Sequence, residues 1–202
     1  MANRRAIQAE ATRAEVVAAA RELFLARGYV GTSVAAIADQ AGVAVQTIYN
    51  SIGNKAAVLS AVLDVAAAGP DAPRPVADFL QDRADNTADL AGLTQLLADW
   101  FTDVHERTVE VFELIRQTAA VYPEVAALER ERADRRLANY RTAAESARAR
   151  GGLNSGMTNA QAAAAIWALA HPQAYRSLVV DGGWDPLEYR AWLRRGLAGV
   201  LQ

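Results

Sequence analysis

Residues 32–50 read TSVAAIADQAGVAVQTIYN. Thr32 and Ser33 can cap the N-terminus of a helix, and apolar residues follow them at three- and four-residue spacing. Gly42 interrupts this pattern, and a third short helix is predicted over about 44–50, with Ile48 as its apolar anchor. Two short helices joined by a tight glycine turn predict a helix-turn-helix.

The flanking residues predict a helix on each side of this motif. Thr12 and Glu15 have the spacing of a capping box, which would open an amphipathic helix, and Gly28 is placed to end it in a left-handed conformation. Asn54 is placed to cap a fourth helix that continues to about residue 68. We therefore expect three helices in residues 1–53, followed by a connecting helix.

The rest of the chain also predicts helices, with no period-two alternation that would indicate strands. The prolines in 69–75 cannot continue a helix, so that segment is read as a turn. Further helices are predicted near 76–84, 88–106, 108–120, 124–150, 158–180 and 186–201. The fold class is predicted to be all-α.

Composition excludes several classes of function. The 202 residues include no cysteine and two histidines, which excludes thiolate metal sites and cysteine nucleophiles and leaves little for a metal centre. No zinc-protease, nucleophile-elbow, Walker or dinucleotide motif is present, so we expect neither an enzyme nor a cofactor. No apolar run reaches a membrane span or a signal peptide, which predicts a cytoplasmic protein with no membrane partner.

The charge is distributed unevenly. Residues 1–60 have a net charge of +2, whereas the remaining 142 residues have a net charge of −4. This suits a small polyanion-binding head on an acidic body, although a difference of this size also arises by chance.

The third helix is predicted to present polar and small apolar residues outward. Gln46 can bond an adenine edge, and the methyl groups of Val45 and Thr47 can contact thymine. Phosphate contacts are expected from Thr32, Tyr49 and Lys55. The full set of predicted DNA contacts is Arg4, Arg5, Thr32, Ser33, Ala44, Val45, Gln46, Thr47, Tyr49, Asn50 and Lys55. Arg4 and Arg5 form either an arm in the minor groove or a solvated start of the chain.

A helical hairpin with a solvated polar face would explain a shorter match, but the pattern here extends from about Thr12 to Val62. It resembles the N-terminal DNA-binding domain of the TetR family of transcriptional repressors. The resemblance is carried by Ala19-Ala20-x-x-Leu23-Phe24, Gly28-Tyr29-x-Gly31-Thr32-Ser33-Val34, Ile37-Ala38, Ala41-Gly42-Val43, Thr47-Ile48-Tyr49 and Lys55-x-x-Val58-Leu59. It implies a DNA-binding domain over 1–53 and a helical ligand-binding and dimerisation domain over 54–202.

Two departures from the family pattern concern DNA contacts. The recognition helix starts Ala44-Val45-Gln46, where the family often has a basic residue or glycine, and Asn50-Ser51-Ile52 replaces its usual aromatic residues. These replacements predict fewer phosphate and base contacts, while Ile52 keeps the apolar anchor.

The resemblance also implies a small-molecule chamber in the body. Residues expected to line it are Trp100, Phe101, Val104, His105, Phe112, Ile115, Arg116, Tyr140 and Trp167. The alternative is that this aromatic stripe is ordinary core. The last two helices are expected to pair with a second copy through Ile166, Tyr175, Leu178, Val179, Tyr189, Trp192, Leu193, Leu197 and Val200, or to close the subunit's own core.

The sequence therefore predicts a ligand-responsive transcriptional regulator. Its expected partners are a palindromic operator in double-stranded DNA, a second copy of the chain, and a small apolar or amphipathic effector that releases a repressor from DNA. The alternative is a helical protein-interaction module with a degenerate DNA-binding head. Steep salt dependence of binding would favour the first reading.

Overall fold

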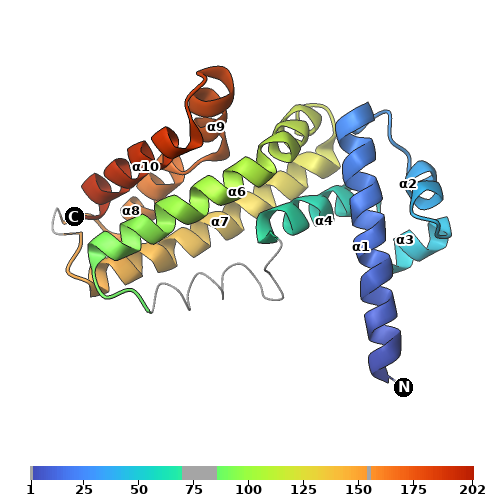
Figure 1. Cartoon of the computed structure of the whole chain (residues 1–202), viewed down its shortest axis with the longest axis horizontal. Helices are drawn as coiled ribbons and strands as arrows, with labels where there is room; N and C mark the ends of the chain where they lie inside the picture. The colour runs from blue at the N-terminus through green and yellow to red at the C-terminus, as the bar shows by residue number, and fades with distance from the viewer. Residues whose placement is uncertain (1, 70–85, 154–155) are drawn as a thin grey trace. The chain divides into compact units, whose positions relative to one another are not determined.

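A computed structural model describes residues 2–69, 86–153 and 156–202, with side chains from residue 6 onward. Every regular element in this described part is helical, so the predicted all-α class is confirmed (Figure 1). The helices are α1 Ala2–Arg27, α2 Val34–Gln40, α3 Val45–Ser51, α4 Lys55–Ala68, α6 Leu90–Ala119, α7 Pro123–Ala149, α8 Asn159–Leu169, α9 Pro172–Tyr175, a π-helical segment Arg176–Asp181 and α10 Pro186–Leu201.

The chain divides into two compact units that share two helices. The first unit comprises 1–66 and 110–130, and the second comprises 67–109 and 131–202. Both α6 and α7 therefore contribute residues to each unit. This division differs from the predicted boundary after residue 53, because Val58 and Leu59 of α4 and Val111 of α6 belong to the same buried cluster as α1.

Local signals in the first unit act as predicted at the turns. Gly28 and Gly42 have φ of +69° and +67°, the left-handed region that glycine enters without a Cβ penalty. Ser33 caps α2 by accepting a hydrogen bond from the Ala36 N–H, and Asn54 accepts one from the Ala57 N–H at the start of α4. These caps and turns fix where α2, α3 and α4 begin and end.

The start of α1 differs from prediction. The helix begins at Ala2, so Thr12 lies in its interior and opens no capping box. Residues 2–11 contain no proline or glycine and are rich in alanine, which favours continuing the helix toward the N-terminus. Arg4 and Arg5 therefore lie on a helical backbone, and their side chains fall outside the described part.

A buried apolar cluster holds the first unit together. Phe24 of α1, Ile37 of α2 and Ile48 of α3 are each at most 1% exposed. Ile115 of α6 and Val125 of α7 complete the same cluster. Each short helix therefore depends on tertiary packing rather than on its own length.

Two helix boundaries in the second unit also differ from prediction. The predicted break near residue 107 is absent, and α6 runs through it because no glycine or proline stands there. The predicted helix 158–180 is interrupted at His171, which caps α9 ahead of Pro172. The predicted helix 76–84 lies outside the described residues, as does the 69–75 turn beyond Gly69.

Across the described residues, no single helix is long and apolar enough to cross a membrane; only α3 and α4 taken together, with a bend of 65°, reach the required length and composition.

Candidate functional site

The recognition-helix candidate α3 is anchored on one side and exposed on the other. Ile48 is fully buried, whereas Val45 and Tyr49 are 40% and 48% exposed. Gln46 and Asn50 are also exposed, and Thr47 is half-buried. Ala44, the N-cap residue, provides no side-chain cap, and its small side chain is exposed. The side chains predicted to face outward are therefore exposed or half-buried on α3, a helix of seven residues whose place in the chain Figure 1 shows.

The two amides of α3 are linked one turn apart. Gln46 Nε2 donates to Asn50 Oδ1 at 2.9 Å. This bond uses one amide hydrogen of Gln46 and leaves its Oε1 acceptor and second N–H for another partner. The pair therefore retains the donor and acceptor that an adenine edge requires.

Thr32 is buried, which argues against the predicted phosphate contact. Its side chain is buried, and its hydroxyl lies 2.8 Å from the Gly28 carbonyl and 3.1 Å from the Leu23 carbonyl, both of which can accept from it. These bonds give Thr32 a structural role at the α1–α2 turn. Ser33 is exposed, but its oxygen already serves the α2 N-terminus.

Replacing Thr32 with valine is expected to lower the free energy of unfolding by about 1–2 kcal/mol, because a buried carbonyl loses its donor while the shape is kept. DNA affinity of the folded protein should stay within about twofold, since the side chain points inward. Urea unfolding and a DNA-binding titration measure the two effects. Weaker DNA binding at unchanged stability would contradict the inward assignment.

Lys55 stands half-buried at the start of α4. Its Nζ lies 4.1 Å from the ring centroid of Tyr29, a cation–π contact. Burial lowers the pKa of Lys55, an effect that the Glu124 carboxylate opposes. Burial raises the pKa of Tyr29 to about 12, with Glu124 and Tyr122 adding to the rise. Tyr29 thus holds the Lys55 ammonium beside the helix-turn-helix, and the phosphate contact of Lys55 remains a prediction.

Arg13 is a residue whose position the sequence did not reveal. Its Nη1 donates to the Ser51 carbonyl at 2.9 Å and so connects α1 to the last turn of α3. A cation at a helix C-terminus also interacts favourably with the helix dipole. No local pattern indicates this contact, because the two residues are 38 positions apart.

In the second unit, aromatic side chains from α6, α7, α8, α9 and α10 gather in one buried cluster. Phe101 lies 5.4 Å from Tyr140 and 6.0 Å from His105, measured between ring centroids. Tyr140 lies 6.1 Å from Trp167. We call this set, completed by Trp100, Tyr175 and Tyr189, the aromatic cluster.

His105 is the polar centre of the aromatic cluster. It is 3% exposed, and its Nδ1 lies 3.2 Å from the Tyr189 hydroxyl. Burial lowers the pKa of His105 to about 3, with smaller contributions in the same direction from His171 and Arg136. Burial likewise raises the pKa of Tyr140 to about 12. At neutral pH the cluster therefore holds an uncharged imidazole and uncharged phenols.

Not all predicted chamber residues reach this cluster. Five of them belong to it, namely Trp100, Phe101, His105, Tyr140 and Trp167. Val104 is buried on α6, the helix that also carries Phe101 and His105. Phe112, Ile115 and Arg116 instead lie in the first unit. Ile115 packs in that unit's core, and Arg116 is exposed, with a two-point hydrogen bond to Glu113.

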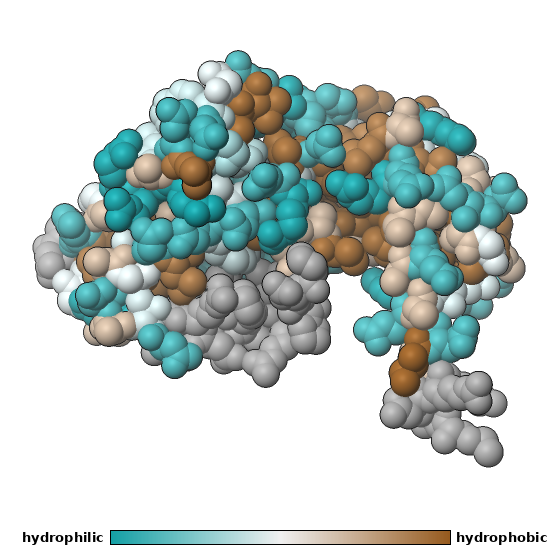
Figure 2. Space-filling view, viewed as in Figure 1, coloured by the Kyte–Doolittle hydropathy of each residue, from teal (hydrophilic) through white to brown (hydrophobic). Residues whose placement is uncertain are grey.

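The predicted dimer residues divide into two groups. Five are buried within the chain's own core, namely Ile166, Tyr175, Tyr189, Leu193 and Leu197. Leu178, Val179, Trp192 and Val200 are only partly buried. The structure adds exposed apolar residues that the sequence analysis did not single out, Val180, Trp184 and Leu187. On the face seen in Figure 2, hydrophilic residues cover most of the second unit, with small hydrophobic patches between them.

Within the described residues, no group of histidine, cysteine, aspartate or glutamate side chains could hold a metal ion.

Comparisons with known proteins agree with the helix-turn-helix geometry. Residues 16–62 match the family model for bacterial regulatory proteins of the tetR family. Among curated proteins, no sequence matches this chain.

Solved structures share the fold over nearly the whole chain. NalD, the secondary repressor of the MexAB-OprM multidrug efflux pump in Pseudomonas aeruginosa, is 25% identical with a TM-score of 0.71; the match covers 95% of this chain and 97% of NalD. SmeT in complex with triclosan is 19% identical with a TM-score of 0.70, covering 95% and 92%. The resemblance to the TetR family of transcriptional regulators is therefore confirmed by the family model over residues 16–62, and solved structures share the fold over nearly the whole chain.

Proposed function

We propose that this protein is a ligand-responsive repressor that binds a palindromic operator as a homodimer. The observation that carries the proposal is the exposed surface of α3, on which Val45, Gln46 and Tyr49 face outward from a buried Ile48. In a two-fold dimer, two such helices held about 34–36 Å apart would enter successive major grooves.

Within this proposal, the residues of α3 have separate tasks. Gln46, held by Asn50, reads an adenine edge, and Val45 and Thr47 contact thymine methyl groups. The hydroxyl of Tyr49 and the ammonium of Lys55 contact phosphates, which fixes the register without reading sequence.

The effector is proposed to bind among the aromatic side chains of the second unit. A mostly apolar site with a few polar groups suits a small apolar or amphipathic molecule, and the His105–Tyr189 pair supplies the polar groups. Such a ligand weakens DNA binding if it binds better to the conformation that does not fit the operator, and DNA weakens the ligand by the same factor.

Selection of random duplex DNA by the purified protein tests the regulator proposal. Enrichment of a two-fold symmetric motif is expected, and it should be lost in the Gln46→Ala/Tyr49→Phe double variant. Singly, Gln46→Ala should relax preference at one or two positions, costing about 1–3 kcal/mol of discrimination there. Tyr49→Phe should lower affinity for all sequences alike.

Two results would contradict this assignment. An unchanged motif with Gln46→Ala would show that Gln46 does not read bases. No enrichment at low salt, where phosphate contacts are strongest, would favour an interaction module instead.

A further inference from the structure

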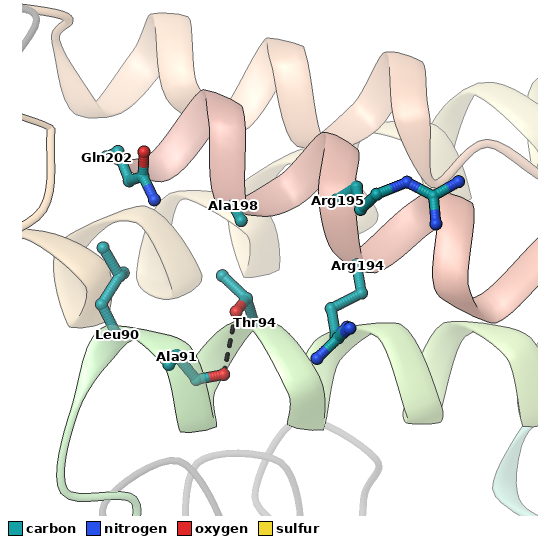
Figure 3. A pocket seen from close by; sticks show the side chains of 7 residues that line it. All are labelled: Leu90, Ala91, Thr94, Arg194, Arg195, Ala198 and Gln202. Carbon is teal, nitrogen blue, oxygen red and sulfur yellow. Dashed lines mark hydrogen bonds between the residues drawn. The ribbon is translucent and has the colours of Figure 1, made fainter.

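A groove of about 430 Å³ lies between the start of α6 and the end of α10 (Figure 3). Its lining residues are Leu90, Ala91, Thr94, Arg194, Arg195, Ala198 and Gln202. None of them belongs to the aromatic cluster, so the groove is separate from the proposed effector site. Its volume falls in the range of small-molecule sites.

The charges along one stripe of α10 set this groove apart. Arg190, Arg194 and Ala198 follow each other at four-residue spacing and therefore lie on one side of the helix. Arg190 is neutralised by α6, with its guanidinium nitrogens 3.4 Å from Asp99 and 3.4 Å from Asp103. One turn further along α10, Arg194 has no such ion pair within the described residues.

Around Arg194, α6 supplies no carboxylate. The lining residues on that side are Leu90, Ala91 and Thr94, and the Thr94 hydroxyl donates to the Ala91 carbonyl at 2.9 Å. The neighbouring Asp89 carboxylate accepts from the Gly92 N–H and so caps α6. In the described part of the chain, neither Arg194 nor Arg195 has an ion pair with an acidic side chain.

Figure 3 shows how the two arginines lie. The side chain of Arg194 extends toward α6 across the groove, and that of Arg195 extends away along the rim. Leu90, Ala91 and Ala198 provide apolar surface at the same groove. A cation at one side of an apolar surface calls for a ligand with an anionic head and an apolar tail.

We propose that this groove binds a small amphipathic carboxylate. The carboxylate pairs with the Arg194 guanidinium, whose planar fork matches two carboxylate oxygens, and the tail lies on Leu90, Ala91 and Ala198. Arg195 adds positive charge at the rim. The ligand carboxylate thus pairs with Arg194 as the carboxylates of Asp99 and Asp103 pair with Arg190.

Calorimetric titration with decanoate at low ionic strength tests the proposal. The wild-type protein should bind decanoate, and the neutral analogue decanol should bind at least about tenfold more weakly, because it lacks the charge. Arg194→Gln should weaken decanoate binding by about tenfold or more while leaving decanol binding unchanged. Added salt should weaken decanoate binding, because the groove is open to solvent.

Two further variants localise the effect. Arg141→Gln removes the same charge from an exposed position on α7 and should bind decanoate as the wild type does. Ala91→Glu places a carboxylate in the groove and should abolish the binding. Both positions are exposed, and unchanged thermal unfolding would confirm that the variants fold.

Three outcomes would overturn the proposal. The first is no decanoate binding by the wild type at low salt. The second is equal binding by the wild type, Arg194→Gln and Ala91→Glu, as expected if decanoate enters the aromatic cluster. The third is equal weakening by Arg141→Gln and Arg194→Gln, which would indicate only a general effect of net charge.

Discussion

Replacing Ile48 with alanine is expected to lower the free energy of unfolding by about 2–5 kcal/mol. The side chain is fully buried in the apolar cluster of the first unit, where it is the only buried residue of α3. A helix of seven residues cannot hold its own conformation in water, so α3 depends on this anchor. Specific DNA binding should be lost with it. Urea unfolding followed by circular dichroism, and DNA titration below the unfolding transition, measure both effects.

Val45→Ala is the matched control for this prediction. Val45 lies on the same helix but is 40% exposed, so its truncation should change stability by no more than about 0.5 kcal/mol. DNA affinity should still fall, because a methyl contact to thymine is removed. Similar losses of stability from Val45→Ala and Ile48→Ala would mean that α3 presents a different face to the core.

Acidification is expected to destabilise the second unit through His105. Its pKa is about 3 in the folded chain and about 6.5 when unfolded, because burial disfavours the charged imidazole. Above pH 6.5 the imidazole is neutral in both states, and the free energy of unfolding has its full value. It falls as the pH drops from 6.5 toward 3. The unfolded state binds the proton first, and the loss approaches about 1.4 kcal/mol per pH unit, or about 2 kcal/mol by pH 5.

The variant His105→Gln tests this assignment. Glutamine keeps a donor and an acceptor for Tyr189 but does not titrate, so the variant should be less stable at pH 7 and show a flatter dependence on pH. His171→Gln is the control, because His171 is only partly buried and should account for a smaller share of the slope. A slope that survives His105→Gln and disappears with His171→Gln would reverse the assignment.

The parts of the structure predicted correctly from sequence have local causes. Gly28 and Gly42 mark turns because the backbone there enters a conformation that other residues rarely adopt. Ser33 and Asn54 mark helix starts because their side chains bond backbone groups three residues away. The outward set on α3 follows from helical spacing around a single apolar anchor, Ile48.

The errors arise where tertiary packing decides. Thr32 has a hydroxyl suited to a phosphate contact, yet that hydroxyl is bonded to two carbonyls, of Leu23 in α1 and of Gly28 in the turn that follows. For Tyr175 and Tyr189 the sequence left two alternatives open, a dimer face and the subunit's own core, and the structure buries both side chains against His105. Spacing shows that such residues share a face, but not which neighbouring element covers that face.

Because α6 and α7 contribute residues to both units, the first unit cannot be moved to another protein as residues 1–66 alone. The core of the first unit is completed by Val111, Ile115 and Val125, which lie far along the chain from its first 66 residues. A fragment cut after α4 would leave the apolar surface that these residues cover in contact with water. Grafting residues 1–66 onto another regulator would therefore require residues 110–130, the end of α6 and the start of α7, as well. Otherwise the recipient must carry matching apolar side chains at the equivalent place. Recombination that exchanges the first unit for that of another protein during evolution meets the same constraint.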